Sequence, residues 1–411
     1  MTEARQAGVI SSLLGAAVSF GSETPQPQAK LVFPRDHLLH LNMGTEWYWL
    51  SFNVTAAGSD GCDRISGFAT FKRVRSVSPD VQRQAGWTDV EAQIGATTAT
   101  LTFATREHCE IVRRGPNVQW PALGGDVEFG EFFFRNGPDF LKGSVNVLPL
   151  AVHIDDGPNM TVDLTMSSPL PEASAFFQQA DKYKSAGAGA GFYYSWPQLT
   201  VEGSITAGAR TYKVRGSGWI CHQMMMLLPS SSAAVGVTPT PDFDPTASVN
   251  GWSWCQFNLE NGDAFTAVAV QSGTLRGTLL VPYGWYVQRN GDEWLPTFVI
   301  GSVHLDRFVP GLEGVLIPSA WRYTATALPG ERPIDAEVLA VPWYPDGSFS
   351  DFDLQVQGET AVDVALTDYG RINTQSGSGR LLTGSGYCES VSYEPQERYI
   401  ERALAYLKCT S

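Results

Sequence analysis

The sequence has few charged residues, and the basic ones are in the minority. Only 17% of its 411 residues are charged, and 28 Lys and Arg residues stand against 42 Asp and Glu residues, a formal net charge of -14. Proteins that bind a nucleic-acid backbone use Lys and Arg to release its counterions. We therefore expect no nucleic-acid partner. The 43% content of hydrophobic residues predicts a globular chain that can bury a core.

Long hydrophobic runs are also missing. No segment approaches the roughly 18 to 20 apolar residues that cross a bilayer as a helix, so we expect no transmembrane segment. Residues Gly8–Phe20 have the length of a signal-peptide core, but Glu3 offsets the single preceding Arg5 and no small-residue cleavage site follows. Two glycosylation sequons begin at Asn53 and Asn159. Location in the cytoplasm or the secretory pathway stays open, as does the oligomeric state.

The motifs of several large enzyme classes are absent. The sequence has no Walker loop and no G-x-S-x-G elbow, and the glycine-rich stretch 185–191 leads into Trp196-Pro197 instead of a helix, which excludes a dinucleotide fingerprint. No histidine pair has the H-E-x-x-H spacing, and we place His37 and His40 in a mobile N-terminal region. Hydrolase, kinase and dehydrogenase functions are not expected, and neither is a metal or another cofactor.

The abundant residues are those of β-structure. The chain has 12 Trp, 14 Tyr and 21 Phe, together with 41 Gly and 25 Pro, which favours many short strands joined by tight turns. Segments with alternating apolar and polar residues follow one another from 45–54 to 160–166. The stretch 199–216 predicts two further strands around a turn, and 250–270 predicts a hairpin through Asn261-Gly262. This order is typical of antiparallel barrels and sandwiches.

The pattern divides the chain into two β-domains. Residues 238–248 are rich in Pro, Thr and Asp and are the best candidate for a linker. We therefore expect a mobile N-terminus over 1–30, an N-terminal β-domain over 31–237 and a C-terminal β-barrel domain over 249–411. The last domain should end with an amphipathic helix from about Glu394 to Lys408, because apolar residues recur there with helical spacing.

Residues 216–226 hold the densest group of chemically active side chains. In a strand, Trp219, Cys221 and Gln223 face one side of the sheet and His222 faces the other. Glu46 lies among aromatic residues in the strand 45–54. A carboxylate in such surroundings is paired with a buried donor, is partly protonated, or lies at a strand edge where it reaches solvent or an Arg.

Five short motifs carry a resemblance to a known group. They are Glu46-Trp47-Tyr48-Trp49, Tyr193 to Pro197, Gly218-Trp219-x-x-His222-Gln223, Gly251-Trp252-Ser253-Trp254 and Gly384-x-Gly-Tyr-x-Glu389. In this order they resemble the two-domain lipocalin-like proteins of the AttH and carotenoid 1,2-hydratase group. Fungal kievitone hydratase and the fungal decalin-forming Diels-Alderases are similar. The resemblance implies an all-β fold of two lipocalin-like antiparallel β-barrel or β-sandwich domains with a C-terminal helix.

One position departs from this group. Hydratases of the group carry an Asp, thought to protonate the alkene, where this chain has Cys221. A thiol, with an ordinary pKa near 8.5, is a poor acid towards a carbon–carbon double bond. We therefore expect a cofactor-free cyclase or pericyclase, similar to a Diels-Alderase, that holds an apolar polyene, terpenoid or polyketide and polarises it by hydrogen bonds. A hydratase of an isoprenoid alkene and a non-catalytic carrier of an apolar ligand are the alternatives.

The candidate site follows from these motifs. The expected catalytic residues are His222, Gln223, Glu46 and Tyr193. The expected substrate-binding residues are Trp47, Trp49, Tyr194, Trp219, Cys221, Trp252 and Trp254.

Overall fold

The computed structural model forms two compact units, which are described separately. Unit 1 comprises Met1–Val235 and Asn290–Trp294, and unit 2 comprises Gly236–Arg289 and Leu295–Ser411. The residues that the structure describes are 31–41, 44–57, 64–75, 79–104, 109–120, 131–172, 175–178, 191–225, 248–274, 277–310, 316–327, 335–341, 369–374 and 381–391. The expected mobile segment 1–30 and the expected helix 394–408 lie outside them. So does the expected linker 238–248, apart from Ser248, and the domain boundary stays a prediction.

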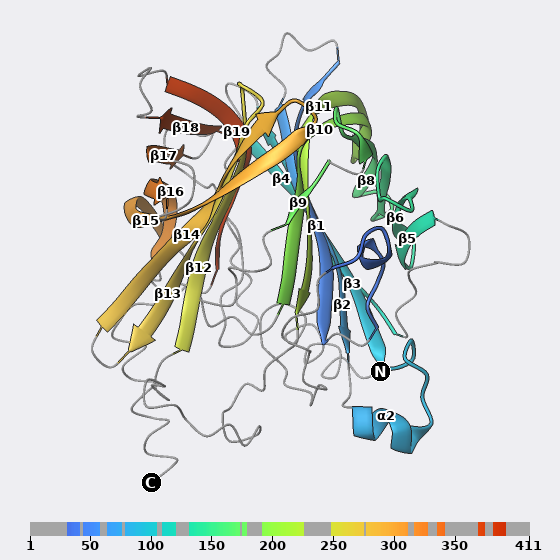
Figure 1. The fold of residues 1–411 in the computed structure, drawn as a ribbon. Helices are drawn as coiled ribbons and strands as arrows, with labels where there is room; N and C mark the ends of the chain where they lie inside the picture. Colours follow the sequence, from blue (N-terminus) through green and yellow to red (C-terminus); the bar gives the residue numbers. More distant parts are fainter. Residues whose placement is uncertain are drawn as a thin grey trace. The chain divides into compact units, whose positions relative to one another are not determined.

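Unit 1 contains an eleven-stranded antiparallel sheet (Figure 1). Its strands run in the order β4-β3-β2-β1-β11-β10-β8-β7-β6-β5, and β9 pairs with β10. A short 3-10 helix, η1 (Arg35–His37), precedes the sheet, and the α-helix α2 (Pro79–Ala85) joins β2 to β3. The strands are β1 (Thr45–Ala56), β2 (Arg64–Arg75), β3 (Gln93–Ala104), β4 (Cys109–Gln119), β5 (Glu131–Asn136), β6 (Asp139–Ser144), β7 (Leu150–Asp155), β8 (Met160–Ser167), β9 (Phe177–Gln178), β10 (Gly191–Ala207) and β11 (Arg210–Met225).

Unit 2 is a closed antiparallel barrel of eight strands in sequence order. The strands are β12 (Ser248–Leu259), β13 (Ala264–Thr274), β14 (Gly277–Asn290), β15 (Glu293–Pro310), β16 (Leu316–Ala327), β17 (Asp335–Val341), β18 (Tyr369–Thr374) and β19 (Leu381–Val391). The hairpin predicted through Asn261-Gly262 joins β12 to β13, and Gly262 there adopts a left-handed conformation with φ of 87°. Together the two units confirm the predicted all-β fold.

Along the strands of unit 1, side chains alternate between buried and exposed positions. In β5, Phe132 and Phe134 are buried while Glu131 is exposed, and β8 repeats the same period of two. None of the helices in the described part of the chain is long and apolar enough to span a membrane.

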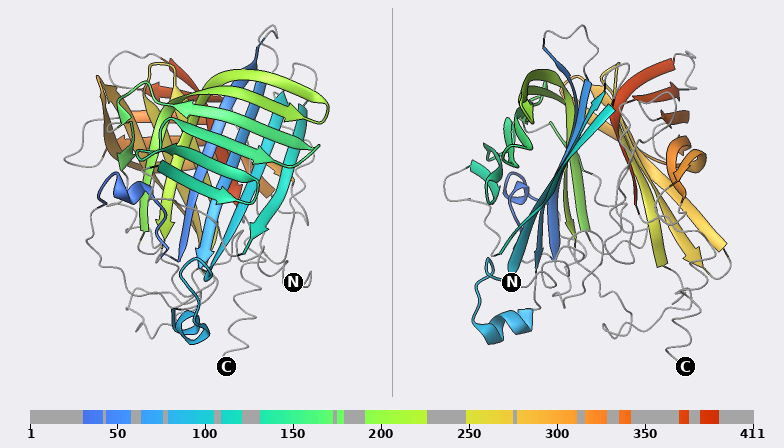
Figure 2. Two further views of the ribbon diagram at one scale, coloured as in Figure 1. Left: turned by 90° about the vertical axis from the view of Figure 1, so that its right-hand side faces the viewer. Right: turned by 180° about the vertical axis from the view of Figure 1, so that it is seen from behind.

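The core of unit 1 lies where its sheet folds over itself. Figure 2 shows β5 to β8 crossing in front of the strands β1 to β3. The Tyr48 ring on β1 packs on Phe132 of β5 with 4.8 Å between ring centroids, and Phe71 on β2 packs on Phe134 at 5.9 Å. These residues belong to one large buried apolar cluster. Its burial stabilises the sheet and leaves β1 and β11 fixed at its centre.

The pairing of β1 with β11 depends on glycine at one position. A Cβ atom at Gly216 would lie 2.1 Å from the backbone oxygen of Asn53, a distance that real Cβ contacts do not show. The pairing aligns Glu46 with Met224, Tyr48 with His222, and so on along both strands. Residues far apart in sequence are thereby brought into fixed rows.

Candidate active site

Four neighbouring strands, β2, β1, β11 and β10, carry most of the predicted site residues in rows across the sheet. One row contains Lys72, Trp47, Gln223 and Tyr193, and the row two residues along contains Thr70, Trp49, Cys221 and Ser195. Because side chains alternate along a strand, these two rows share one face of the sheet. We call it the aromatic face, and it consists of these eight residues together with Phe68, Ser51 and Trp219.

The rows between them lie on the other face, which we call the core face. One such row contains Phe71, Tyr48, His222 and Tyr194, and the next aligns Arg73, Glu46 and Met224. Most of these apolar side chains belong to the buried cluster of unit 1. The predicted site residues of unit 1 are therefore divided between two faces of one sheet.

The aromatic face combines indole rings with hydrogen-bond donors. The Lys72 Nζ lies 5.5 Å from the centroid of the Trp47 ring, within the range of a cation–π contact. Burial lowers the pKa of Lys72 to about 8, because removal from water disfavours the charged amine. Trp49 stacks on Phe68 with 6.3 Å between ring centroids. The ammonium group of Lys72 therefore lies at one end of a row that continues with the indole of Trp47, the carboxamide of Gln223 and the phenol of Tyr193.

The thiol of this face is tied to its neighbours. The Tyr193 hydroxyl donates to Cys221 Sγ at 2.7 Å, and the Ser195 hydroxyl donates to the same sulfur at 3.4 Å. Cys221 is buried and forms no disulfide. Trp219 and Gln223, which flank it on the same face, are buried as well. The face therefore presents neutral donors and aromatic surface around a thiol.

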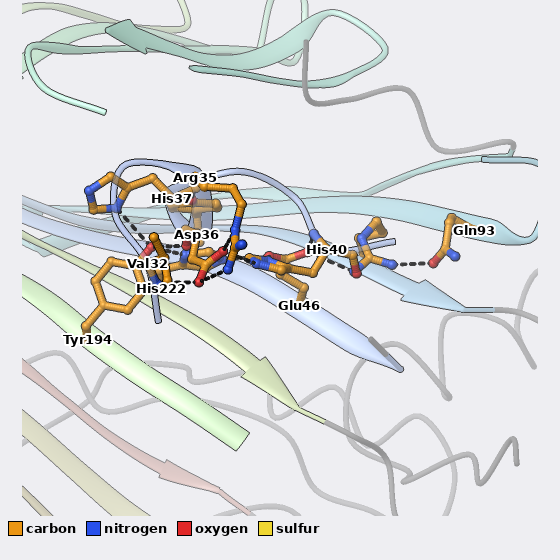
Figure 3. Close-up of polar contacts among 11 residues, drawn as sticks. Val32, Arg35, Asp36, His37, His40, Glu46, Gln93, Tyr194 and His222 are labelled. Atoms are coloured by element: carbon orange, nitrogen blue, oxygen red, sulfur yellow. Dashed lines mark hydrogen bonds and ion pairs between the residues drawn. The ribbon is translucent and has the colours of Figure 1, made fainter. Parts of the chain in front are cut away.

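On the core face, Glu46 is the centre of a network of polar contacts (Figure 3). Its side chain has no exposed surface. Its Oε1 accepts from His222 Nε2 at 2.8 Å and from His40 Nδ1 at 3.0 Å, and its Oε2 accepts from Arg73 Nη2 at 2.8 Å and from the His40 backbone N–H at 2.7 Å. Glu46 is thus paired with buried donors, one of the alternatives that the sequence left open.

These contacts fix the charge of Glu46. Burial alone would raise the pKa of its carboxyl group, but the hydrogen bonds from His222 and His40 and the charge of Arg73 outweigh it. They hold the pKa well below its usual range. Glu46 is ionised at neutral pH and is therefore not a proton donor there.

The network continues from His222 to the phenol of Tyr194. His222 Nδ1 lies 2.5 Å from the Tyr194 hydroxyl, which also contacts His37 Nδ1 at 3.1 Å and the backbone oxygen of Asp36 at 2.9 Å. Burial raises the pKa of Tyr194 well above its ordinary value, so the phenol stays protonated. Tyr48 stacks on the His222 ring with 4.0 Å between centroids and donates to the His37 backbone oxygen.

His40 is the most exposed of the groups that contact Glu46, with 23% of its side chain accessible. Its Nε2 lies 3.5 Å from Asp36 Oδ1, and Asp36 is itself paired with Arg35 at 2.6 Å. Burial would lower the pKa of His40, but Glu46 and Asp36 outweigh that effect and raise it. By contrast, burial is the dominant influence on His222 and lowers its pKa.

Arg73 and Gln93 hold the segment around His40 against the sheet. Arg73 donates to the His40 backbone oxygen at 2.5 Å and to the Gln93 side chain, and Gln93 donates to the Leu41 backbone oxygen at 3.0 Å. Arg73 is almost wholly buried. These two residues connect β2 and β3 to the chain that enters β1.

The structure brings the predicted residues together in three groups. Glu46, His222 and Tyr194 meet on the core face. Trp47, Trp49, Tyr193, Trp219, Cys221 and Gln223 share the aromatic face. Trp252 and Trp254 lie on β12 in unit 2.

The placement of His37 and His40 in a mobile region was wrong. His37 is buried in η1, and His40 contacts Glu46. Arg73, Gln93 and Asp36 were missed as well, although Arg73 follows Lys72 in a strand whose alternation places it beside Glu46. Among the described residues, His40, Glu46 and His222 also have ligand atoms within 4.8 Å of one another, close enough to hold a metal ion.

One unit with a large antiparallel sheet and a second unit with a closed barrel are the features of two-domain, lipocalin-like β proteins. The profile of the AttH-like family matches residues 24–328. The chain therefore belongs to the AttH-like family, which confirms the resemblance seen in its motifs.

Solved structures share the fold. A structure described as an AttH from Nitrosomonas europaea is 16% identical over 90% of this chain and 100% of its own, with a TM-score of 0.60. Kievitone hydratase from Nectria haematococca is 13% identical over 92% of this chain and 98% of its own, with a TM-score of 0.52. At such low identity these likenesses concern the fold alone. A comparison with curated proteins gave no match.

Proposed function

We propose that this protein is a cofactor-free cyclase that binds an apolar small molecule on the aromatic face and promotes a pericyclic ring closure. The observation that carries the proposal is the row formed by Lys72, Trp47, Gln223 and Tyr193 across four strands. It places an ammonium, a carboxamide and a phenol beside indole rings. Such a surface is suited to a substrate that is largely apolar but carries a carbonyl group.

The reaction depends on the shape of the binding surface and on polarisation of the substrate carbonyl more than on proton transfer. In an intramolecular cycloaddition, a diene and a dienophile form two new carbon–carbon single bonds and lose two π bonds in total, and no atom enters or leaves. Trp47, Trp49 and Trp219 would hold the chain in a near-attack conformation, which removes much of the entropic barrier. Lys72 and Gln223 would donate to the carbonyl conjugated with the dienophile and stabilise the charge that it gains.

The composition of the aromatic face supports this choice over acid catalysis. None of its eleven positions is Asp or Glu. Lys72, with a pKa of about 8, is largely protonated at pH 7 and donates well to a carbonyl, but it is a weak acid towards an alkene carbon. The proposal leaves Glu46 and His222 out of catalysis, because their side chains lie on the core face and contact each other there. Trp252 and Trp254 remain predicted substrate contacts.

A hydratase is the second candidate. The fold likeness to kievitone hydratase favours it. The hydrogen bond from Tyr193 to Cys221 also supplies two groups that can exchange a proton. In this reaction an alkene and one water molecule give an alcohol, with one proton delivered to carbon. The two candidates therefore differ in the mass of the product and in the origin of its hydrogen atoms.

Incubation in deuterated water separates these candidates. We would supply linear polyenes that end in a conjugated carbonyl and analyse the product by mass spectrometry and NMR. The cyclase predicts a product of unchanged mass with no deuterium at carbon. A product that has gained water and carries deuterium at carbon would instead establish the hydratase. Stoichiometric binding without any product would establish a carrier.

A further inference from the structure

We propose that His40, Glu46 and His222 form a binding site for a divalent transition-metal ion such as Zn²⁺. Each residue offers one ligand atom, and these three atoms lie within 4.8 Å of one another. The sequence predicted no metal site, because the three residues have none of the familiar spacings. The pairing of β1 with β11 brings Glu46 and His222 together, and His40 lies in the segment that precedes β1.

The distances suit a shared ion. Zinc lies about 2.0 to 2.2 Å from imidazole nitrogen and carboxylate oxygen, so neighbouring ligand atoms of a tetrahedral or octahedral site are about 3.0 to 3.4 Å apart. His222 Nε2 and His40 Nδ1 lie 2.8 and 3.0 Å from Glu46 Oε1. The two imidazole nitrogens lie within 4.8 Å of each other. Small movements of the side chains would place all three atoms around one ion, which would replace the protons now shared between them.

Each candidate ligand is held from behind by another polar group. His222 uses its other ring nitrogen to contact the Tyr194 hydroxyl at 2.5 Å, and His40 uses its own to approach Asp36 at 3.5 Å. The second oxygen of Glu46 is bound by Arg73 at 2.8 Å. Such outer contacts orient the ligands of metal centres and fix which ring nitrogen faces the ion.

The donor set selects the kind of ion. Two imidazoles and one carboxylate suit Zn²⁺, Fe²⁺, Co²⁺ and Ni²⁺, whereas Mg²⁺ and Ca²⁺ prefer oxygen ligands alone. His40 is the partly exposed ligand, and so the ion would enter from its side. Arg73 neutralises the far oxygen of Glu46, while Asp36 adds a carboxylate, itself paired with Arg35, behind His40.

The ion would join the segment that follows η1 to the centre of the sheet. It would link His40 to β1 through Glu46 and to β11 through His222. This site lies on the core face, whereas the proposed catalysis takes place on the aromatic face of the same strands. A failure of the metal proposal would leave the proposed function untouched, and the reverse also holds.

The test measures metal binding by the full chain with any affinity tag removed. After loading with Zn²⁺ and dialysis, elemental analysis should find about one ion per chain in the wild type. The His40→Ala and Glu46→Gln variants should lose that ion. Titration with Co²⁺ should give visible absorption bands in the wild type but in neither of these two variants. Tyr194→Phe should weaken affinity about 10- to 100-fold, as expected for an outer contact.

A matched control uses a histidine outside the cluster. His153 pairs with Asp163 at 2.6 Å on the surface of β7 and β8, so His153→Ala should retain the ion. Circular dichroism establishes that each variant is folded, and His40→Ala changes only a partly exposed side chain. The proposal would be overturned by equal zinc content in the wild type and His40→Ala, or by loss of all zinc from the wild type on dialysis. The three residues would then form a hydrogen-bonded network without a metal ion.

Discussion

The ion pair between Glu46 and Arg73 gives the sharpest prediction for stability. The two side chains are 0% and 1% exposed, and Glu46 Oε2 lies 2.8 Å from Arg73 Nη2. Glu46→Gln keeps the shape of the side chain but removes its charge, so the Arg73 cation stays buried without compensation. The amide nitrogen of Gln would also replace one of the two Glu46 oxygens, each of which accepts a hydrogen bond from His40. Removal of one partner of a buried ion pair costs about 3 to 5 kcal/mol.

An exposed pair on the same unit supplies the control. Glu131 and Lys142 are 3.0 Å apart, but each side chain is 51% exposed. Exposed ion pairs are worth about 0.2 to 1 kcal/mol, because water screens them. We therefore expect Glu131→Gln to change the free energy of unfolding by less than about 1 kcal/mol.

Urea unfolding with a chelator present measures both variants. Tryptophan fluorescence and circular dichroism follow the transition, and the difference in midpoint gives the change in free energy when the slope is unchanged. If Glu46→Gln costs no more than Glu131→Gln, then Glu46 is not a buried anion in the folded protein. The pairing of Glu46 with His222, His40 and Arg73 would then be refuted.

Three further predictions follow from other parts of unit 1. His37 is buried, and burial together with the nearby His222 lowers its pKa to about 3 from 6.5. Below pH 6.5 the unfolded chain therefore binds a proton that the folded chain does not, so the free energy of unfolding decreases as the pH falls from 6.5 towards 3. At pH 5 the loss should be about 2 kcal/mol. Urea unfolding at pH 7 and at pH 5 should show a smaller loss in His37→Asn than in the wild type. Loss of the Lys72 charge as the pH rises through about 8 should lower the rate of cyclisation, and a pH–rate profile of Lys72→Met should lack that step. Gly216→Ala should lower stability by about 1 to 3 kcal/mol in the same assay, because its Cβ atom would meet the Asn53 oxygen at 2.1 Å; an unchanged midpoint would show that β11 can move away from β1.

Local pattern was sufficient to predict an all-β chain and the faces of the strand around Cys221. The alternation around Cys221 correctly separated His222 from Trp219, Cys221 and Gln223, because side-chain direction along a strand depends only on its period of two. The same rule could have placed Arg73 on the face opposite Lys72.

The network itself could not be predicted, because it depends on pairing between distant segments. Glu46 and His222 are 176 positions apart and meet only because β1 pairs with β11 in one register. His40 comes from a segment with no strand or helix period, so nothing local indicated that Arg73 and Gln93 fix it beside Glu46. The charge and burial of Glu46 follow from these distant contacts.

The most direct test of the proposed catalytic face compares the rates of two variants on that face with a matched control. Lys72→Met and Gln223→Leu remove donors from the aromatic face, and Lys142→Met removes an exposed amine elsewhere on unit 1. With a polyene substrate that the wild type cyclises, we expect kcat/KM to fall about 10- to 100-fold or more in the first two and to stay unchanged in the third, as for the removal of a donor that stabilises developing charge. Full activity in Lys72→Met and Gln223→Leu would contradict the account, because the reaction would then not depend on the aromatic face.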